Sequence, residues 1–282
     1  MLHCECFATY WTLLLLKAKP VGMLRRRKPE PAPPTPITLA QIREASAEAL
    51  ATAFAGPPGE AARWIAAAAR AGHKDAVLLY GQILADGRGV KQDRAAALGW
   101  FRVAAEAGDV RGTNMLGRCH ELGWGTPPDF PRAAALYAEA AERGYDWAQY
   151  NLATLHARGA GVQQDRQRAL ALFRAAAAQG HAKSLTVLGR FMEEGWDGVP
   201  RDPAAAYALY VRAAQAGDFR AQFNLGTLLV EDGRAEDAMP WFHQAAATGS
   251  PDMLAVMAQR LATRPEPALR QLAADITTRL AG

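Results

Sequence analysis

The sequence predicts an all-α fold, an α/α superhelical solenoid of helix–turn–helix repeats, and three observations lead to this prediction. The first is that a stretch containing an Ala-Ala pair and closing with glycine recurs six times. The closing glycines are spaced by 36, 36, 36, 37 and 32 residues. A fixed period of this length is typical of stacked arrays, in which each unit buries its apolar face against its neighbours. These glycines are Gly72, Gly108, Gly144, Gly180, Gly217 and Gly249.

Composition and turn sequences supply the other two observations. Half of the 282 residues are apolar and only 8% are aromatic. Ala dominates the apolar residues, which suits packed helices because Ala is the best helix former and a poor strand former. Each complete unit also has a glycine-rich turn that ends in Asp, a residue type that caps helix N termini. The length alone would fit one solenoid or one to two globular domains.

The first helix of each unit contains an apolar residue followed by a small one, and the small residue is usually glycine. Gly inside a helix costs about 1 kcal/mol relative to Ala. We therefore expect the backbone of the partner helix to approach closely at these positions. A mostly small residue lies four positions earlier, on the same helix face. The pairs are Tyr80-Gly81, Leu116-Gly117, Leu152-Ala153, Leu188-Gly189, Leu225-Gly226 and Met257-Ala258, and the earlier residues are Ala76, Gly112, Ala148, Ser184 and Ala221.

The turn and the second helix are equally regular. We expect the first glycine of the turn to end the first helix in the left-handed conformation. A turn valine should fill the gap between the two helices, and the final Asp should cap the second helix. An aromatic residue in the second helix is the expected core anchor. The valines are Val90, Val162 and Val199, the caps are Asp93, Asp129, Asp165 and Asp202, and the anchors are Phe101, Tyr137, Phe173, Tyr210 and Phe242.

The combination of L-G-x-x-apolar, G-x-G-V-x-x-D and [FY]-x-x-A-A-x-x-G in one unit resembles the Sel1-like repeat, a longer-looped relative of the tetratricopeptide repeat (TPR). Four units match well, and residues 218–249 have lost the long turn and look TPR-like. Residues 37–72 and 250–282 resemble degenerate terminal units, the second being a C-terminal cap. The four well-matched units are 73–108, 109–144, 145–180 and 181–217.

The resemblance implies a superhelix that acts as a protein-interaction scaffold, a role found often in bacterial envelope, secretion or signalling pathways. A secreted branch of the family pairs a cysteine in every repeat, and the single repeat cysteine here, Cys119, excludes that branch. Pro240 lies within the second helix expected for residues 218–249. Because Pro removes a helical hydrogen bond, this helix should begin late or bend there.

Residues 1–36 are expected to form a flexible tail ahead of the solenoid of residues 37–282, and to contribute little to its stability. The apolar segment 7–16 is too short to span a bilayer. We favour a mis-assigned start for residues 1–22, with Met23 as the true start. An uncleaved membrane anchor and a weak export signal are the alternatives. Membrane contact is expected only through residues 1–28.

The net charge of +4 also belongs to the tail. Residues 1–36 contain six basic and two acidic side chains, which leaves 26 of each sign in the repeats. A neutral repeat body argues against nucleic-acid binding by the repeats. Three cysteines do not make a disulfide framework, so a reducing compartment is the simpler interpretation. We expect a cytoplasmic protein, with membrane association through the N terminus as the alternative.

No catalytic, cofactor or metal site is predicted. Cys119 with His120 suggests a metal ligand, but zinc needs three or four converging ligands. We expect Cys119 to fill the core and His120 and His156 to pack at its rim, with a metal or proton-switch pair as the alternative. The glycine-rich turns follow no strand and lack the Lys-Ser/Thr of a phosphate loop. The chain is therefore expected not to be an enzyme, although an enzyme built on such repeats is the rival hypothesis.

The predicted binding site lies on the first helices, which line the concave face of TPR-like stacks. Their non-core positions form a cationic and aromatic groove suited to a protein or peptide partner with acidic and apolar groups. Arg118 and Arg190 would hold acidic groups, and Trp147 with Tyr150 would anchor apolar ones. The alternative for Tyr150 and Phe223 is ordinary packing. The predicted groove residues are Arg111, Asn114, Arg118, Trp147, Tyr150, Thr154, Lys183, Arg190, Arg220 and Phe223, with Leu78, Gln82, Thr186 and Thr227 in the same stripes.

Two tryptophans, Trp124 and Trp196, occupy equivalent turn positions two repeats apart. Few neighbours can bury a side chain at the tip of a turn. Each therefore either folds back onto the second helix of its unit or belongs to an exposed contact patch.

Overall fold

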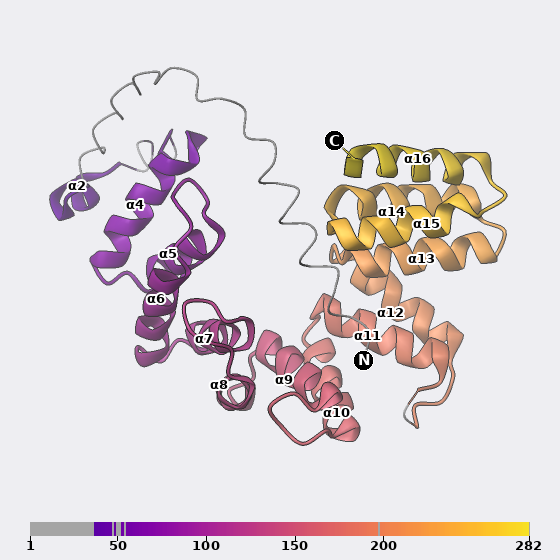
Figure 1. Cartoon of the computed structure of the whole chain (residues 1–282), viewed down its shortest axis with the longest axis horizontal. Coiled ribbons are helices and arrows are strands. Elements are labelled where there is room, and N and C mark those ends of the chain that lie inside the picture. Colours follow the sequence, from indigo (N-terminus) through magenta and orange to yellow (C-terminus); the bar gives the residue numbers. More distant parts are fainter. Residues whose placement is uncertain (1–36, 47, 49–51, 54, 197, 282) are drawn as a thin grey trace, which may run out of the picture. The chain divides into compact units, whose positions relative to one another are not determined.

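The computed structural model describes residues 37–46, 48, 52, 53, 55–196 and 198–281, which form α-helices joined by turns, with no strand among them (Figure 1). This confirms the all-α solenoid. The expectations for residues 1–36 lie outside the described part. The helices are α2 (Leu39–Glu44), α4 (Pro58–Arg70), α5 (Lys74–Asp86), α6 (Arg94–Glu106), α7 (Val110–Leu122), α8 (Phe130–Glu142), α9 (Asp146–Arg158), α10 (Arg166–Ala178), α11 (Ala182–Glu194), α12 (Pro203–Gln215), α13 (Phe219–Glu231), α14 (Ala235–Thr248), α15 (Pro251–Ala262) and α16 (Pro267–Ala281).

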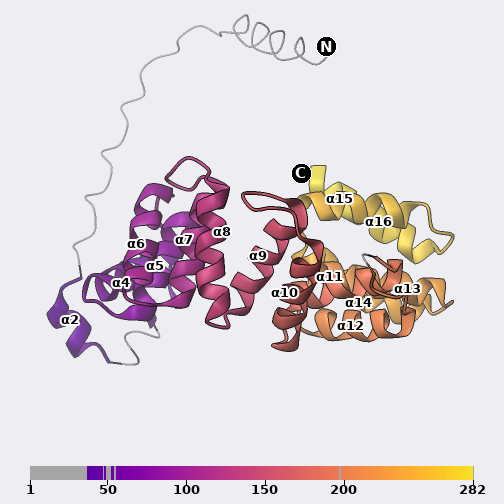
Figure 2. The same ribbon diagram turned by 90° about the horizontal axis from the view of Figure 1, so that it is seen from below.

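The helices alternate between two positions in the stack, which we call helix A and helix B (Figure 2). The odd-numbered helices from α5 to α15 are A helices, and the even-numbered helices from α4 to α16 are B helices. Each A helix packs against the B helix that follows it, and from α4 to α13 each B helix packs against the next A helix. In the described part of the chain, no helix is long and apolar enough to cross a membrane.

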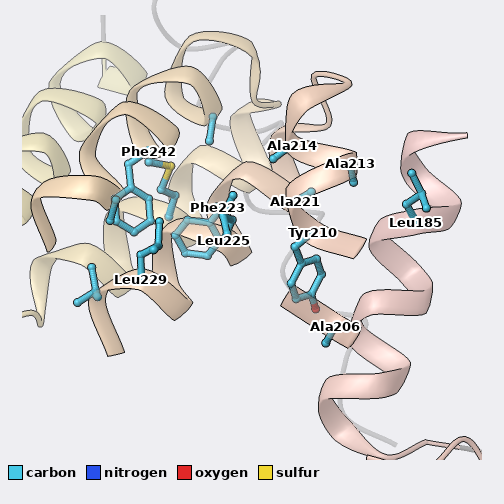
Figure 3. Packing of buried hydrophobic residues seen from close by; sticks show 14 of the residues in the cluster. Leu185, Ala206, Tyr210, Ala213, Ala214, Ala221, Phe223, Leu225, Leu229 and Phe242 are labelled. Carbon is cyan, nitrogen blue, oxygen red and sulfur yellow. The ribbon is translucent and has the colours of Figure 1, made fainter. Parts of the chain in front are cut away.

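The core runs along the stack between the A and B helices. All five aromatic anchors are buried, which confirms their predicted role. Tyr210, Phe223 and Phe242 belong to one apolar cluster that reaches from α9 to α16 (Figure 3). Val199 is buried, and Val90 and Val162 pack half-buried against the core.

The turns end and begin the helices as expected. The A helices α5, α7, α9 and α11 end at glycines with φ between 68° and 73°. The four turn aspartates accept a hydrogen bond from the backbone N–H three residues later, which confirms their capping role. These caps satisfy donors that a helix leaves unpaired at its first turn.

The glycines of the apolar-plus-small pairs adjoin aromatic rings rather than the partner backbone, which corrects the expectation. A Cβ at Gly81 would lie 2.7 Å from the Phe101 ring, and one at Gly117 would lie 2.8 Å from the Tyr137 ring. Close backbone contact occurs instead at Gly112, where an added Cβ would come within 2.8 Å of the Ala104 carbonyl carbon in α6. One small position in the A helix therefore admits the ring of its own unit, and the other admits the preceding B helix.

Two helical glycines make this interpretation testable. Gly99→Ala in α6 should stabilise the chain by up to about 1 kcal/mol, because its Cβ meets no atom within 4 Å. Gly117→Ala should instead destabilise by about 1–2 kcal/mol, since the buried Tyr137 ring cannot yield without strain. Chemical denaturation of both variants measures the difference, and two shifts of the same sign would contradict the assignment.

The helix around Pro240 does not begin late, contrary to one of the two outcomes predicted. Helix α14 runs from Ala235 to Thr248 with Pro240 inside it. Pro240 is exposed, so its ring lies on the solvent side. The carbonyl that loses its helical partner there can be hydrated, which limits the cost of the proline.

Candidate protein-interaction surface

Three consecutive A helices, α11, α13 and α15, line a groove of about 490 Å³, which we call the α11–α13–α15 groove. Its lining includes positions from the predicted stripes, so side chains about one repeat apart in sequence converge on one surface. Charged, polar and apolar groups all contribute. The lining residues are Thr186, Val187, Arg190, Glu193, Glu194, Arg220, Phe223, Asn224, Thr227, Met253, Val256 and Arg260.

An aromatic cluster is formed by Trp147 and Tyr150 of α9 with His181, the N-cap residue of α11, and Lys183 in the first turn of α11. The Lys183 Nζ atom lies 5.0 Å from the centre of the Trp147 ring and 5.9 Å from that of Tyr150, within cation–π range. The His181 ring lies 4.7 Å from Trp147 and 5.0 Å from Tyr150. Trp147 remains 40% exposed, so the cluster offers an aromatic face to solvent.

His181 fixes the start of α11 beneath this face. Its side chain accepts a hydrogen bond from the Ser184 backbone N–H and caps the helix. Burial lowers the His181 pKa, which favours the neutral ring that can accept this bond. Burial also lowers the Lys183 pKa, and Arg220 and Arg118 add to the effect. Lys183 is therefore a partly desolvated cation on an aromatic surface.

Some predicted groove residues support the surface from below. Asn114 is buried and accepts a hydrogen bond from Asn151 Nδ2 at 2.9 Å. Phe223 is buried beside Phe242 and forms part of the groove floor. Tyr150 packs against Phe173, with ring centres 5.8 Å apart, and is half-buried. Tyr150 and Phe223 therefore pack against core side chains, as the alternative interpretation expected, and also contribute to the candidate surface.

The predicted arginines differ in their surroundings. Arg111 is tied by ion pairs of 2.6 Å to Asp109 and 2.7 Å to Asp75 in the preceding unit. The Asp109 pKa is lowered chiefly by its hydrogen bond with Arg111. The Arg190 side chain, by contrast, is 60% exposed. Its Nε atom lies 4.0 Å from Glu194 Oε1, a longer separation than in the two Arg111 ion pairs. Arg111 thus links two units, whereas Arg190 faces the groove.

The turn tryptophans fold back, and each contacts a side chain of helix A of its unit. Trp196 stacks on Phe191 of α11 with ring centres 4.5 Å apart. The Trp124 ring lies 5.3 Å from the Arg118 guanidinium carbon and 5.4 Å from that of Arg94 in the preceding B helix. Both tryptophans are half-buried, and their contacts hold the turns against the stack.

Two tyrosine–glutamate pairs were missed by the sequence reasoning. The Tyr137 hydroxyl donates to Glu121 Oε2 at 2.6 Å, and Tyr210 donates to Glu193 at 2.7 Å. Units with Phe as the anchor have an apolar residue at the position of the glutamate. The signal was present in the sequence as a coordinated change: Tyr occurs with Glu four residues after the helix-A glycine, and Phe with Ala or Val.

A double-mutant cycle tests this pairing. Glu121→Ala alone should cost about 1–3 kcal/mol, because it leaves the buried Tyr137 hydroxyl unpaired. Adding Tyr137→Phe should restore part of that stability, since the double variant reproduces the Ala–Phe combination of residues 85 and 101. Urea denaturation of the four proteins gives the coupling energy. Additive losses would show that the two side chains do not depend on each other.

The metal ligands considered from the sequence, Cys119, His120 and His156, belong to no larger group of metal-binding side chains in the described part of the chain. Among the described residues, no group of three or more His, Cys, Asp or Glu side chains could hold a metal ion. Cys119 is fully buried in the core of its unit, as expected, and burial raises its pKa to about 12. His156 lies beside the Gln163 carbonyl, with its Nδ1 atom 3.4 Å away.

The chain is similar to known repeat proteins. Among solved structures, a Sel1 repeat protein from Oxalobacter formigenes is 26% identical (TM-score 0.65; coverage 84% of this chain, 99% of that one). The protective antigen c5321 of uropathogenic Escherichia coli, which has an SLR fold, is also 26% identical (TM-score 0.60; coverage 79% of this chain, 49% of that one). This chain thus spans about half the length of the antigen. The immunity protein Pa5087 of Pseudomonas aeruginosa, 17% identical, shares the fold (TM-score 0.53; coverage 73% and 81%).

A search of curated proteins found no match. The family model of the Sel1 repeat, in contrast, matches five successive segments that together cover more than half of the sequence. They are residues 74–109, 110–145, 148–181, 182–218 and 220–250. Their boundaries follow the helix pairs from α5 to α14, and the chain therefore belongs to the Sel1 repeat family.

Proposed function

We propose that this chain is a non-enzymatic scaffold that binds a protein or peptide partner through the exposed side chains of its A helices. The observation that supports this best is the α11–α13–α15 groove, in which side chains from three successive A helices converge. Repeat proteins commonly bind partners on such extended surfaces. Trp147 adds an exposed aromatic side chain of the type enriched at binding hot spots.

The proposed compartment is the cytoplasm. Its support is the cysteine content, because Cys119 is a free, buried thiol in the solenoid. Free thiols persist where the surroundings are reducing.

Photo-crosslinking from matched positions tests which face binds. A photoreactive phenylalanine analogue at Trp147 (40% exposed, helix A) should crosslink to the partner in cells that express the chain. The same analogue at Val103 (48% exposed, helix B) should not, although this site is equally accessible. Adducts from position 103 and none from position 147 would place the binding surface on the B helices.

A further inference from the structure

Three cations of the A helices have no acidic partner in the described part of the chain. Arg118 of α7, Lys183 of α11 and Arg220 of α13 form no ion pair with any described residue. Arg118 and Arg220 both act on the Lys183 ammonium electrostatically. The nearby acid, Asp218, is buried and accepts hydrogen bonds from Thr186 Oγ1 and the Ala221 backbone N–H, both at 2.9 Å. Its carboxylate is therefore committed to a helix cap.

Lys183 shows why this arrangement points to a ligand. Its ammonium is half-buried over the Trp147 and Tyr150 rings, so it has lost part of its hydration. Burial and, after it, like charges lower its pKa. An anion at this position would reverse both effects, because an opposite charge favours the charged form. Cations held together without a counter-charge are what a carboxylate site requires before its ligand arrives.

The neighbouring groove limits which anion fits. Glu193 and Glu194 line it together with Val187, Phe223 and Val256. These two carboxylates alternate with Arg190, Arg220 and Arg260 in the lining, whereas the continuous negative charge of a nucleic-acid backbone needs a uniformly basic track. Apolar side chains beside the cations instead favour a chain in which acidic and apolar residues are adjacent.

We propose that the partner segment is an acidic peptide, with one carboxylate held by Lys183 and Arg220 and a neighbouring apolar side chain on Phe223 in the α11–α13–α15 groove. This inference rests on the proposed function of the helix-A surface. It specifies that the partner segment is acidic and which side chains contact its carboxylate. Trp147 and Tyr150 provide the apolar platform beside the bound carboxylate.

Peptide selection on the full chain tests the inference. Random 12-residue peptides displayed on phage are selected on the wild-type protein, and an enriched peptide is then synthesised for calorimetric titration. We expect enrichment of Asp or Glu next to aliphatic or aromatic residues. Lys183→Met and Arg220→Gln should each weaken binding of that peptide about tenfold. The matched control Arg102→Gln on helix B should leave its affinity unchanged. Binding should also raise the Lys183 pKa, as followed by NMR of labelled lysine.

The outcomes separate this inference from the proposed function. Neutral or basic peptides, or no enriched peptide at all, would overturn the acidic partner. So would an acidic peptide whose affinity Lys183→Met and Arg220→Gln leave unchanged. Where a peptide is selected, the helix-A surface still stands if Trp147→Ala weakens its binding; where none is selected, the photo-crosslinks from positions 147 and 103 decide. If Trp147→Ala has no effect and Arg102→Gln reduces binding, the proposed function fails as well. Equal competition by oligo-deoxythymidylate would identify a site for phosphate backbones and contradict the peptide.

Discussion

Replacing Gly161 by alanine should destabilise the solenoid by several kcal/mol, more than any other single methyl addition considered. Gly161 has φ of 71°, and a Cβ built there would lie 2.3 Å from the Phe130 carbonyl carbon and 2.5 Å from the Pro131 nitrogen. Left-handed backbone alone costs a non-glycine residue about 1–2 kcal/mol. The added contact involves backbone, so no rotation of a side chain can relieve it.

The effect should appear as a loss of coupling between units as well as a loss of stability. At Gly161 the turn of residues 159–165 packs against the start of α8 in the preceding unit. Because solenoid stability is a sum of unit and interface contributions, weakening one interface divides the cooperative transition. We expect a lower urea midpoint and a smaller m-value. Gly144→Ala is the control, since its φ is 85° but its Cβ meets nothing within 4 Å. Equal losses in both variants would show that only the backbone conformation matters.

Charge reversal on two A helices should abolish partner binding. Arg118 and Arg190 occupy equivalent positions two repeats apart. Arg190 lines the α11–α13–α15 groove, and Arg118 acts electrostatically on Lys183. Arg118→Glu with Arg190→Glu replaces attraction for an acidic segment by repulsion at both sites. Like charges at an interface cost several kcal/mol, so we expect the affinity to fall by a factor of a hundred or more.

The matched control is the same double reversal on the B helices. Arg102 and Arg174 are both exposed, and Arg102→Glu with Arg174→Glu changes the net charge by the same amount. Co-purification with the partner should survive in this control and be lost in the helix-A variant, while circular dichroism of both stays native. Loss of the complex in the control alone would mean that the B helices bind.

The repeat period made most of the fold predictable. It positions each helix pair, and the residues with strong local preferences then set the ends: glycine for the left-handed turn and Asp for the cap. Contacts between units were harder to predict. That Arg111 pairs with Asp75, or that Gly112 meets Ala104, depends on which helices adjoin across the stack. A period gives the order of units, whereas side-chain contacts between them require their packing.

The candidate site was likewise predictable in part: the sequence predicted which residues share a surface, but not how deeply each one is buried. Stripe counting predicted residues that share a surface, and five of them line the α11–α13–α15 groove. It did not separate Asn114, which is buried, from Trp147, which is exposed. Nor did it reveal that Tyr137 and Tyr210 each need a glutamate, because single positions were compared instead of pairs. Coordinated differences between repeats of one chain are therefore a usable signal for buried hydrogen bonds.

Amide hydrogen exchange of the full chain, measured free and in complex with the partner that photo-crosslinking identifies, tests most directly whether the A helices bind. If the A helices bind, exchange should slow in α9, α11, α13 and α15, and the B helices α8, α10, α12 and α14 should exchange as in the free protein. Protection confined to α8, α10, α12 and α14 would contradict a helix-A binding surface.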